Sequence, residues 1–244
     1  MNTKKQKLTH REAHAKAHAH GSVATLNKLR ASVLGANDGI VSVASVVAGV
    51  AGASSSQLFI LTAGVAALSA GALSMAVGEY VSVSSQRDTQ RALLESEKDE
   101  VENYPKEEFE ELVENYKKKG LSGDTALQVA RELTDIDAYA AHVDVELRID
   151  PGDLNNPWHA AFASALAFLA GGAIPMLAVV LSGESTRLFA VFVAVIVALV
   201  VTGILSASVG GAKKFRAIPR VLIGGVLAMV ITYGIGSLLG VGLS

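Results

Sequence analysis

The sequence of 244 residues contains no cysteine and little charge. The absence of cysteine excludes disulfides, thiolate metal sites, iron–sulfur clusters and cysteine nucleophiles. Only 18% of the residues are Asp, Glu, Lys or Arg, against about a quarter in a typical soluble domain. The formal net charge of −2 is small, but the charges are distributed very unevenly along the chain.

Four long stretches contain no Asp, Glu, Lys or Arg at all. They are Gly39–Gly78, Leu154–Gly183, Leu188–Ala212 and Val221–Ser244, with 40, 30, 25 and 24 residues. Each exceeds the roughly 18 residues that indicate a membrane-spanning helix. These stretches exclude a soluble enzyme, a nucleic-acid-binding domain and a disordered protein.

The uncharged stretches predict an all-α, polytopic membrane protein with five transmembrane helices. The first stretch holds two helices because the polar residues 54–57 interrupt it. The expected helices are Ala31–Ala53, Leu58–Tyr80, Pro157–Leu181, Leu188–Ser208 and Val221–Gly240, each near the roughly 20 residues that a span needs. The transmembrane parts therefore cover residues 31–84 and 153–244.

Basic residues predict the orientation of these helices. In chain order, the segments outside the spans contain 7, 0, 9, 1, 4 and 0 Lys or Arg. Cytosolic loops are the basic ones, so the N-terminus is expected in the cytosol and the C-terminus outside. Because no targeting signal is recognised, we expect the cell (inner) membrane, with the vacuolar membrane as the alternative. The cytosolic tail, residues 1–30, carries His10, His14 and His18, which are either a metal-gathering arm or a polar tail without specific ligands.

The segment 85–152 is expected to form a cytosolic, three-helix, acidic domain between the second and third spans. Of the 23 acidic residues, 19 lie between Asp88 and Asp153. The second span is expected to continue to Val101 and to end before Pro105. Residues 106–119 show an amphipathic pattern, and Ser122 can cap a third helix.

Paired carboxylates recur in this domain as Glu-x-x-Glu. Glu97/Glu100 and Glu108/Glu111 are such pairs. Carboxylates at i and i+3 share a helix face and can bind a divalent cation together. The spacing alone leaves a metal site and a solvated acidic face equally open.

Two acidic residues lie in the predicted spans, Asp38 in the first and Glu79 near the cytosolic end of the second. A charged side chain within a bilayer is costly and is a functional-site hypothesis by default. Met75 lies one helical turn from Glu79 on the same face. Glu79 can also extend to the interface, and Met75 can also be a packing residue.

These features resemble the vacuolar iron transporter family. The resemblance rests on the sequence LGANDGIVS at 34–42 and on SMAVGEY at 74–80, followed by Ser82, Ser85, Gln86 and Asp88. Asn155, Pro157 and the sequence GGAIP at 171–175 also fit the family pattern. The resemblance covers the chain from about Asn27 to the C-terminus.

The resemblance implies five spans, a homodimer and exchange of Fe²⁺ for protons. It assigns Asp38 and Met75 to the translocation path, and Glu97, Glu100, Glu108 and Glu111 to a cytosolic metal site. His142 and Glu146 stand where the family has a Met and a Glu as further ligands. Imidazole suits several divalent metals, so His142 affects the expected selectivity rather than metal binding itself.

The leading hypothesis is a secondary transporter, not an enzyme, that exports Fe²⁺ and, as a second candidate, Mn²⁺ in exchange for protons. Asp38, Met75 and Glu79 would form the path. The expected partners are divalent cations including Zn²⁺, protons, the lipid bilayer and a second copy of the chain, with no resident cofactor and no nucleic acid. The alternative is a membrane-anchored metal sensor or buffer without transport. A di-iron oxidase is disfavoured because no Glu has a His three residues later.

Overall fold

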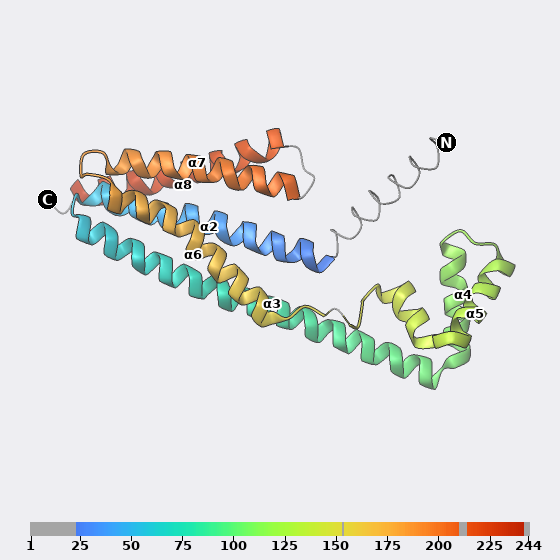
Figure 1. Cartoon of the computed structure of the whole chain (residues 1–244). Coiled ribbons are helices and arrows are strands. Elements are labelled where there is room, and N and C mark those ends of the chain that lie inside the picture. The colour runs from blue at the N-terminus through green and yellow to red at the C-terminus, as the bar shows by residue number, and fades with distance from the viewer. Residues whose placement is uncertain (1–22, 153, 210–213, 242–244) are drawn as a thin grey trace, which may run out of the picture. The chain divides into compact units, whose positions relative to one another are not determined.

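The computed structural model describes residues 23–152, 154–209 and 214–241, and this part of the chain is helical with no strand (Figure 1). The helices are α2 (Val23–Ala53), α3 (Gln57–Asn103), α4 (Pro105–Lys118), α5 (Gly123–His142), the short π-helix η1 (Val143–Leu147), α6 (Pro157–Leu181), α7 (Arg187–Val209) and α8 (Lys214–Val241). Five of them (α2, α3, α6, α7 and α8) are long and apolar enough to cross a membrane. The predicted all-α fold with five spans is therefore confirmed. The N-terminal histidines His10, His14 and His18 lie outside the described residues.

The chain divides into two compact units. The first, here called the membrane unit, comprises the described residues up to Tyr80 and from Pro157 onward, and the second, the acidic unit, comprises the described residues from Val81 to Asn156. Helix α3 contributes residues 57–80 to the membrane unit and residues 81–103 to the acidic unit. The acidic unit begins four residues before the expected start at residue 85 and ends four residues after the expected end at residue 152.

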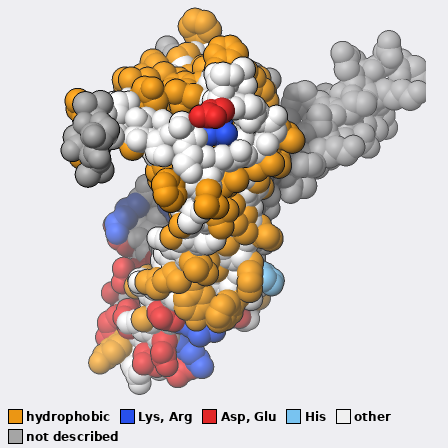
Figure 2. All heavy atoms as spheres, turned by 90° about the vertical axis from the view of Figure 1, so that its left-hand side faces the viewer, with side chains coloured by type: hydrophobic (Ala, Val, Ile, Leu, Met, Phe, Trp, Pro, Cys, Tyr) orange, Lys and Arg blue, Asp and Glu red, His pale blue; other side chains and the backbone are white. Residues whose placement is uncertain are grey.

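Helix α2 is the centre of the membrane unit and packs against α6, α7 and α8. Small residues permit this packing, because a Cβ on Gly39 would collide with the backbone oxygen of Phe168 in α6. Fully buried aliphatic residues of α2, among them Ile40, Val43 and Val47, form the core of the unit. Many large apolar side chains remain exposed on the unit, and Figure 2 shows hydrophobic side chains around a central patch of other residues. Such a surface suits hydrocarbon rather than water.

Helix-start residues in the sequence set the bounds of the helices in the acidic unit. Pro105 occupies the first turn of α4, where its missing N–H leaves no helical hydrogen bond unmade. The Ser122 hydroxyl caps α5 by accepting a hydrogen bond from the backbone N–H of Thr125 at 3.4 Å. Leu112 and Ala126 are fully buried between α4 and α5.

The end of α5 departs from regular α-helix. Residue Asp137 has φ −163° and ψ 99°, which interrupts the helix, and the π-helix η1 begins directly after His142. The turn closes with the Arg148 N–H bonded to the Val143 carbonyl at 2.8 Å, and Arg148 has φ 52° in the left-handed region. Single π-helical turns are frequent at functional sites, because they change the direction in which side chains point.

The tight contact between α2 and α8 predicts a position-specific effect of adding one methyl group. A Cβ on Gly236 would collide with the backbone oxygen of Gly49, whereas a Cβ on Gly234 would meet no atom within 4 Å. We expect Gly236→Ala to destabilise the membrane unit by about 1–3 kcal/mol, the usual effect of overpacking. Thermal unfolding of the detergent-solubilised protein should show a lower midpoint for Gly236→Ala and an unchanged one for the matched control Gly234→Ala. Equal midpoints for the two variants would contradict this packing.

Candidate metal centre

Three side chains from three helices meet in the acidic unit. Glu97 of α3, Glu108 of α4 and His142 of α5 each offer a ligand atom, and these atoms all lie within 4.8 Å of one another. The side chains of Glu97 and His142 are 7% and 2% exposed, so the group is shielded from water. Buried carboxylates of this kind need a cation or hydrogen-bond donors close by.

His142 is the centre of the group, because three carboxylates surround its Nδ1 atom. The distances from Nδ1 are 3.1 Å to Oε1 of Glu146, 3.3 Å to Oε1 of Glu97 and 3.5 Å to Oε2 of Glu108. A single N–H cannot satisfy three carboxylates at once. The Oε1 atom of Glu97 is buried and, despite its proximity to Nδ1, makes no hydrogen bond to any described residue.

The observed distances fit a divalent metal ion. Ligand atoms about 2.1 Å from a tetrahedral or octahedral cation lie about 3.0–3.4 Å from one another. The three separations from Nδ1 are close to these edges, so a modest movement of the side chains would place one cation among them. A mixed set of imidazole and carboxylate ligands suits divalent first-row transition metals.

Asn115 of α4 holds Glu146 in place. Its Nδ2 atom donates a hydrogen bond to Oε1 of Glu146 at 2.9 Å, across the contact between α4 and η1. Asn115 is not among the ligands predicted from the sequence. Its spacing would have indicated it, because residues 108, 111 and 115 lie at i, i+3 and i+7 on one face of a helix.

The carboxylates of the group have raised pKa values. Burial, together with repulsion from Glu146, raises the pKa of Glu97 to about 7, although His142 opposes the rise. Burial likewise raises the pKa of Glu108, and repulsion from Glu111 adds to it. A dication would stabilise the charged form of each carboxylate and so compete with protons for the site.

The other two predicted ligands lie at the edge of this group. Glu100 and Glu111 are exposed, and neither belongs to the set of atoms that converge within 4.8 Å. The Ser96 hydroxyl donates a hydrogen bond to Oε1 of Glu100 at 2.8 Å. Both carboxylates are nevertheless close enough to raise the pKa of Glu108. They extend the negative field around the buried group.

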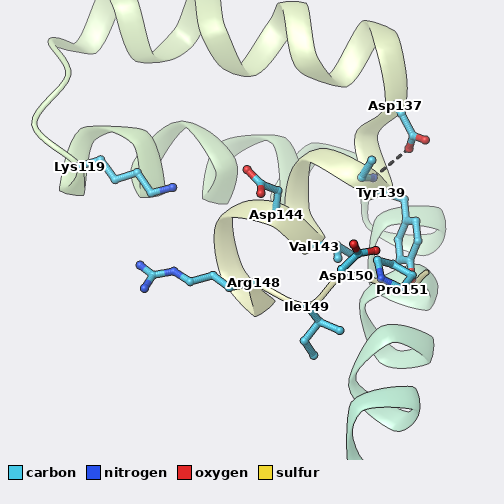
Figure 3. Close-up of a pocket in the computed structure, with 10 residues that line it drawn as sticks. Lys119, Asp137, Tyr139, Val143, Asp144, Arg148, Ile149, Asp150 and Pro151 are labelled. Carbon is cyan, nitrogen blue, oxygen red and sulfur yellow. Dashed lines mark hydrogen bonds between the residues drawn. The ribbon is translucent and has the colours of Figure 1, made fainter. Parts of the chain in front are cut away.

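A separate hollow of about 860 Å³ opens elsewhere in the acidic unit, and Figure 3 shows the residues around it. Its lining includes Lys119, Tyr139, Asp144, Arg148 and Asp150. Glu97, Glu108 and His142 do not line it. This hollow is therefore distinct from the candidate metal centre.

The predicted path residues lie in the membrane unit. The Ser42 hydroxyl donates a hydrogen bond to Oδ1 of Asp38 at 2.8 Å, which leaves Oδ2 of this half-buried carboxylate without a hydrogen bond from a described residue. Asn37 carries a buried Oδ1 without a hydrogen-bond partner in the described chain. Met75 is half-buried and packs against the apolar core, and Glu79 is also half-buried. No hydrogen bond joins Asp38 to Glu79 among the described residues.

The amino-acid sequence was also compared with those of known proteins. Residues 29–237 match the sequence profile of the VIT family. The chain belongs to the VIT family. It is therefore a membrane transporter and not an enzyme. This VIT family protein is 44% identical over 220 residues to a protein named vacuolar iron transporter from Acanthamoeba castellanii, covering 89% of this chain and 80% of the relative.

Plant relatives extend the similarity of this VIT family protein. Vacuolar iron transporter homolog 2 of Arabidopsis thaliana is 38% identical, with 87% of this chain and 84% of the relative covered. VIT-like transporter 1b of Glycine max is 32% identical, with 96% and 87% covered. The matched family profile, residues 29–237, includes residues of both the membrane unit and the acidic unit.

The raised pKa of Glu97 predicts that metal affinity falls on acidification. A carboxyl with a pKa of about 7 is mostly protonated at pH 6 and must lose its proton to bind a cation. From this group alone, the affinity for Mn²⁺ should fall about tenfold between pH 8 and pH 6. Isothermal titration calorimetry of the full chain in detergent measures this change.

Two variants serve as comparisons in the same titrations. Glu97→Gln should bind Mn²⁺ more weakly at pH 8 and show a smaller loss of affinity at pH 6. The exposed Glu100→Gln should retain the pH dependence of the wild type. A wild-type affinity that is constant between pH 6 and pH 8 would contradict the role given to Glu97.

Proposed function

We propose that this VIT family protein is a secondary transporter that exports Fe²⁺ from the cytosol in exchange for protons, with Mn²⁺ as a second substrate. The single observation that carries the proposal is the convergence of Glu97, Glu108 and Glu146 on Nδ1 of His142. The name of the Acanthamoeba relative, vacuolar iron transporter, supports iron as the substrate. The sequence contains no nucleotide-binding loop, which favours an ion gradient as the source of energy.

In this proposal the acidic unit captures the metal ion. The negative field of its carboxylates attracts divalent cations, and the buried group binds one of them. His142 replaces the thioether that the family resemblance implies at this position. An imidazole ligand broadens the range of metals that the site accepts, so Zn²⁺ is also expected to bind.

Asp38 is proposed as the residue that couples metal movement to proton movement. It is a carboxylate within a span, where a negative charge is costly unless a cation or a proton accompanies it. The hydrogen bond from Ser42 fixes Oδ1 and leaves Oδ2 for the transported ion. Met75 would add a softer sulfur ligand, and Glu79 would receive the ion at the cytosolic end of the membrane-spanning part of α3.

Orientation, assembly and location belong to the same proposal. The distribution of Lys and Arg supports a cytosolic acidic unit and a C-terminus on the opposite side. We propose a homodimer in the cell membrane, with the vacuolar membrane as the alternative that the names of the relatives support. A metal sensor or buffer without transport is the second candidate function, because the acidic unit alone could serve it.

Transport in proteoliposomes distinguishes these functions. The wild type should move Fe²⁺ down or against its gradient with an opposite movement of protons. Asp38→Asn preserves the size of the side chain but removes its titratable charge, so it should abolish both fluxes while calorimetry still detects metal binding. Ser208→Ala is the matched control, because among the described residues this exposed hydroxyl donates only to the Ile204 carbonyl of its own helix.

Two outcomes would contradict the proposal. If Asp38→Asn transports Fe²⁺ at the wild-type rate with unchanged pH dependence, the coupling proton is carried elsewhere. If the wild type binds metal but shows no flux, the protein is a sensor or buffer.

A further inference from the structure

Both ends of the Asn115 side-chain amide make hydrogen bonds in the acidic unit. Its Nδ2 atom donates to Oε1 of Glu146 at 2.9 Å, and its Oδ1 atom accepts from Nζ of Lys118 at 3.4 Å. An ionised carboxylate can only accept a hydrogen bond and an ammonium can only donate one. The two partners therefore determine which end of the amide faces the metal centre.

The Oε1 atom of Glu146 lies between Asn115 and His142. It accepts from Nδ2 of Asn115, and it lies 3.1 Å from Nδ1 of His142. A carboxylate oxygen has two acceptor positions. Asn115 occupies one of them, and the other faces the atoms that converge on His142. Asn115 therefore determines how this carboxylate is turned toward the metal centre.

This arrangement disfavours a carboxylate that binds one ion through both of its oxygens. To bring Oε2 as close to the centre as Oε1, the carboxylate of Glu146 must turn and lose its hydrogen bond to Asn115. Ca²⁺ takes six to eight oxygen ligands and commonly uses carboxylates through both oxygens. Divalent first-row transition metals need fewer ligands and accept an imidazole nitrogen among them.

The donor that holds Glu146 is neutral, and this suits a role in metal recognition. A Lys or Arg at this position would form a stronger, charge-assisted hydrogen bond. Its positive charge would also oppose a cation at the same carboxylate. The amide of Asn115 orients Glu146 and leaves its negative charge available to the metal ion.

We propose that Asn115 is a positioning residue that makes the metal centre select transition-metal dications over Ca²⁺. It acts through Glu146, whose Oε1 atom it holds toward His142, and it does not itself bind the metal ion. This inference rests on the proposed capture of Fe²⁺ or Mn²⁺ by the acidic unit and adds a specificity-determining residue to it.

The test compares Mn²⁺ and Ca²⁺ affinities by isothermal titration calorimetry of the full chain in detergent. Asn115→Leu retains a side chain of similar size but lacks the donor. Loss of a group that orients a metal ligand commonly weakens binding by about tenfold or more, so the Mn²⁺ affinity should fall about tenfold. The Ca²⁺ affinity should stay the same or rise, because Glu146 is then free to turn. The preference for Mn²⁺ over Ca²⁺ should therefore fall by about tenfold.

A matched control and a second variant complete the test. Gln128→Leu also removes an exposed amide that donates to a carboxylate, Oε1 of Glu132 at 2.9 Å, and it should leave both affinities unchanged. Asn115→Ala removes the donor without adding an apolar branch, so it should show the same loss of preference as Asn115→Leu.

The ratio of the two affinities separates metal recognition from packing. If both metals lose affinity equally in the two Asn115 variants, the residue only joins α4 to η1 and the proposal is overturned. Unchanged affinities for both metals would overturn it as well. If the wild type shows no coupled Fe²⁺ flux while the Asn115 variants still lose their preference for Mn²⁺, the transport function fails and the role of Asn115 stands.

Discussion

The energetic cost of charge in hydrocarbon organises the whole chain. The spans of the membrane unit are almost free of charged side chains, and 19 of the 23 acidic residues lie in the segment from 88 to 153. The few charged groups that remain in or beside the spans each have a specific setting. Asp38 accepts a hydrogen bond from Ser42, and Arg187 donates one to the carbonyl of Ser55. In a membrane protein, an ionisable residue within a span is a functional-site hypothesis by default.

The same electrostatic cost explains the centre of the acidic unit. Glu97 and Glu108 are buried although desolvation, together with repulsion from neighbouring carboxylates, raises their pKa values. His142 compensates this repulsion only in part, because one N–H faces three carboxylates. A bound dication would neutralise the remaining repulsion between the carboxylates. This repulsion would therefore favour metal binding over an empty site at high pH.

The spans could be predicted from sequence because they depend on local composition. An uncharged stretch of sufficient length specifies a transmembrane helix whatever its neighbours are. Pro105 and Ser122 likewise set the helix starts of the acidic unit through local backbone chemistry. The local sequence alone determines these spans and helix starts.

The composition of the metal centre depends on tertiary packing and could be predicted only in part. The Glu-x-x-Glu spacing placed both members of each pair on one helix face, but the structure buries Glu97 and Glu108 and leaves Glu100 and Glu111 exposed. That choice follows from how α4 and α5 pack and from the π-helical turn after His142, neither of which periodicity indicates. The burial of Arg187 could not be predicted from the sequence either. It depends on the contact of Arg187 with Ser55, which is 132 residues away in the chain.

The most direct test of this account is electron spin-echo envelope modulation of Mn²⁺ bound to the full chain. We expect modulation from one imidazole nitrogen in the wild type, because three carboxylates surround Nδ1 of His142. The modulation should disappear in His142→Met while carboxylate binding of Mn²⁺ persists. Bound Mn²⁺ without nitrogen modulation in the wild type would contradict the proposed centre.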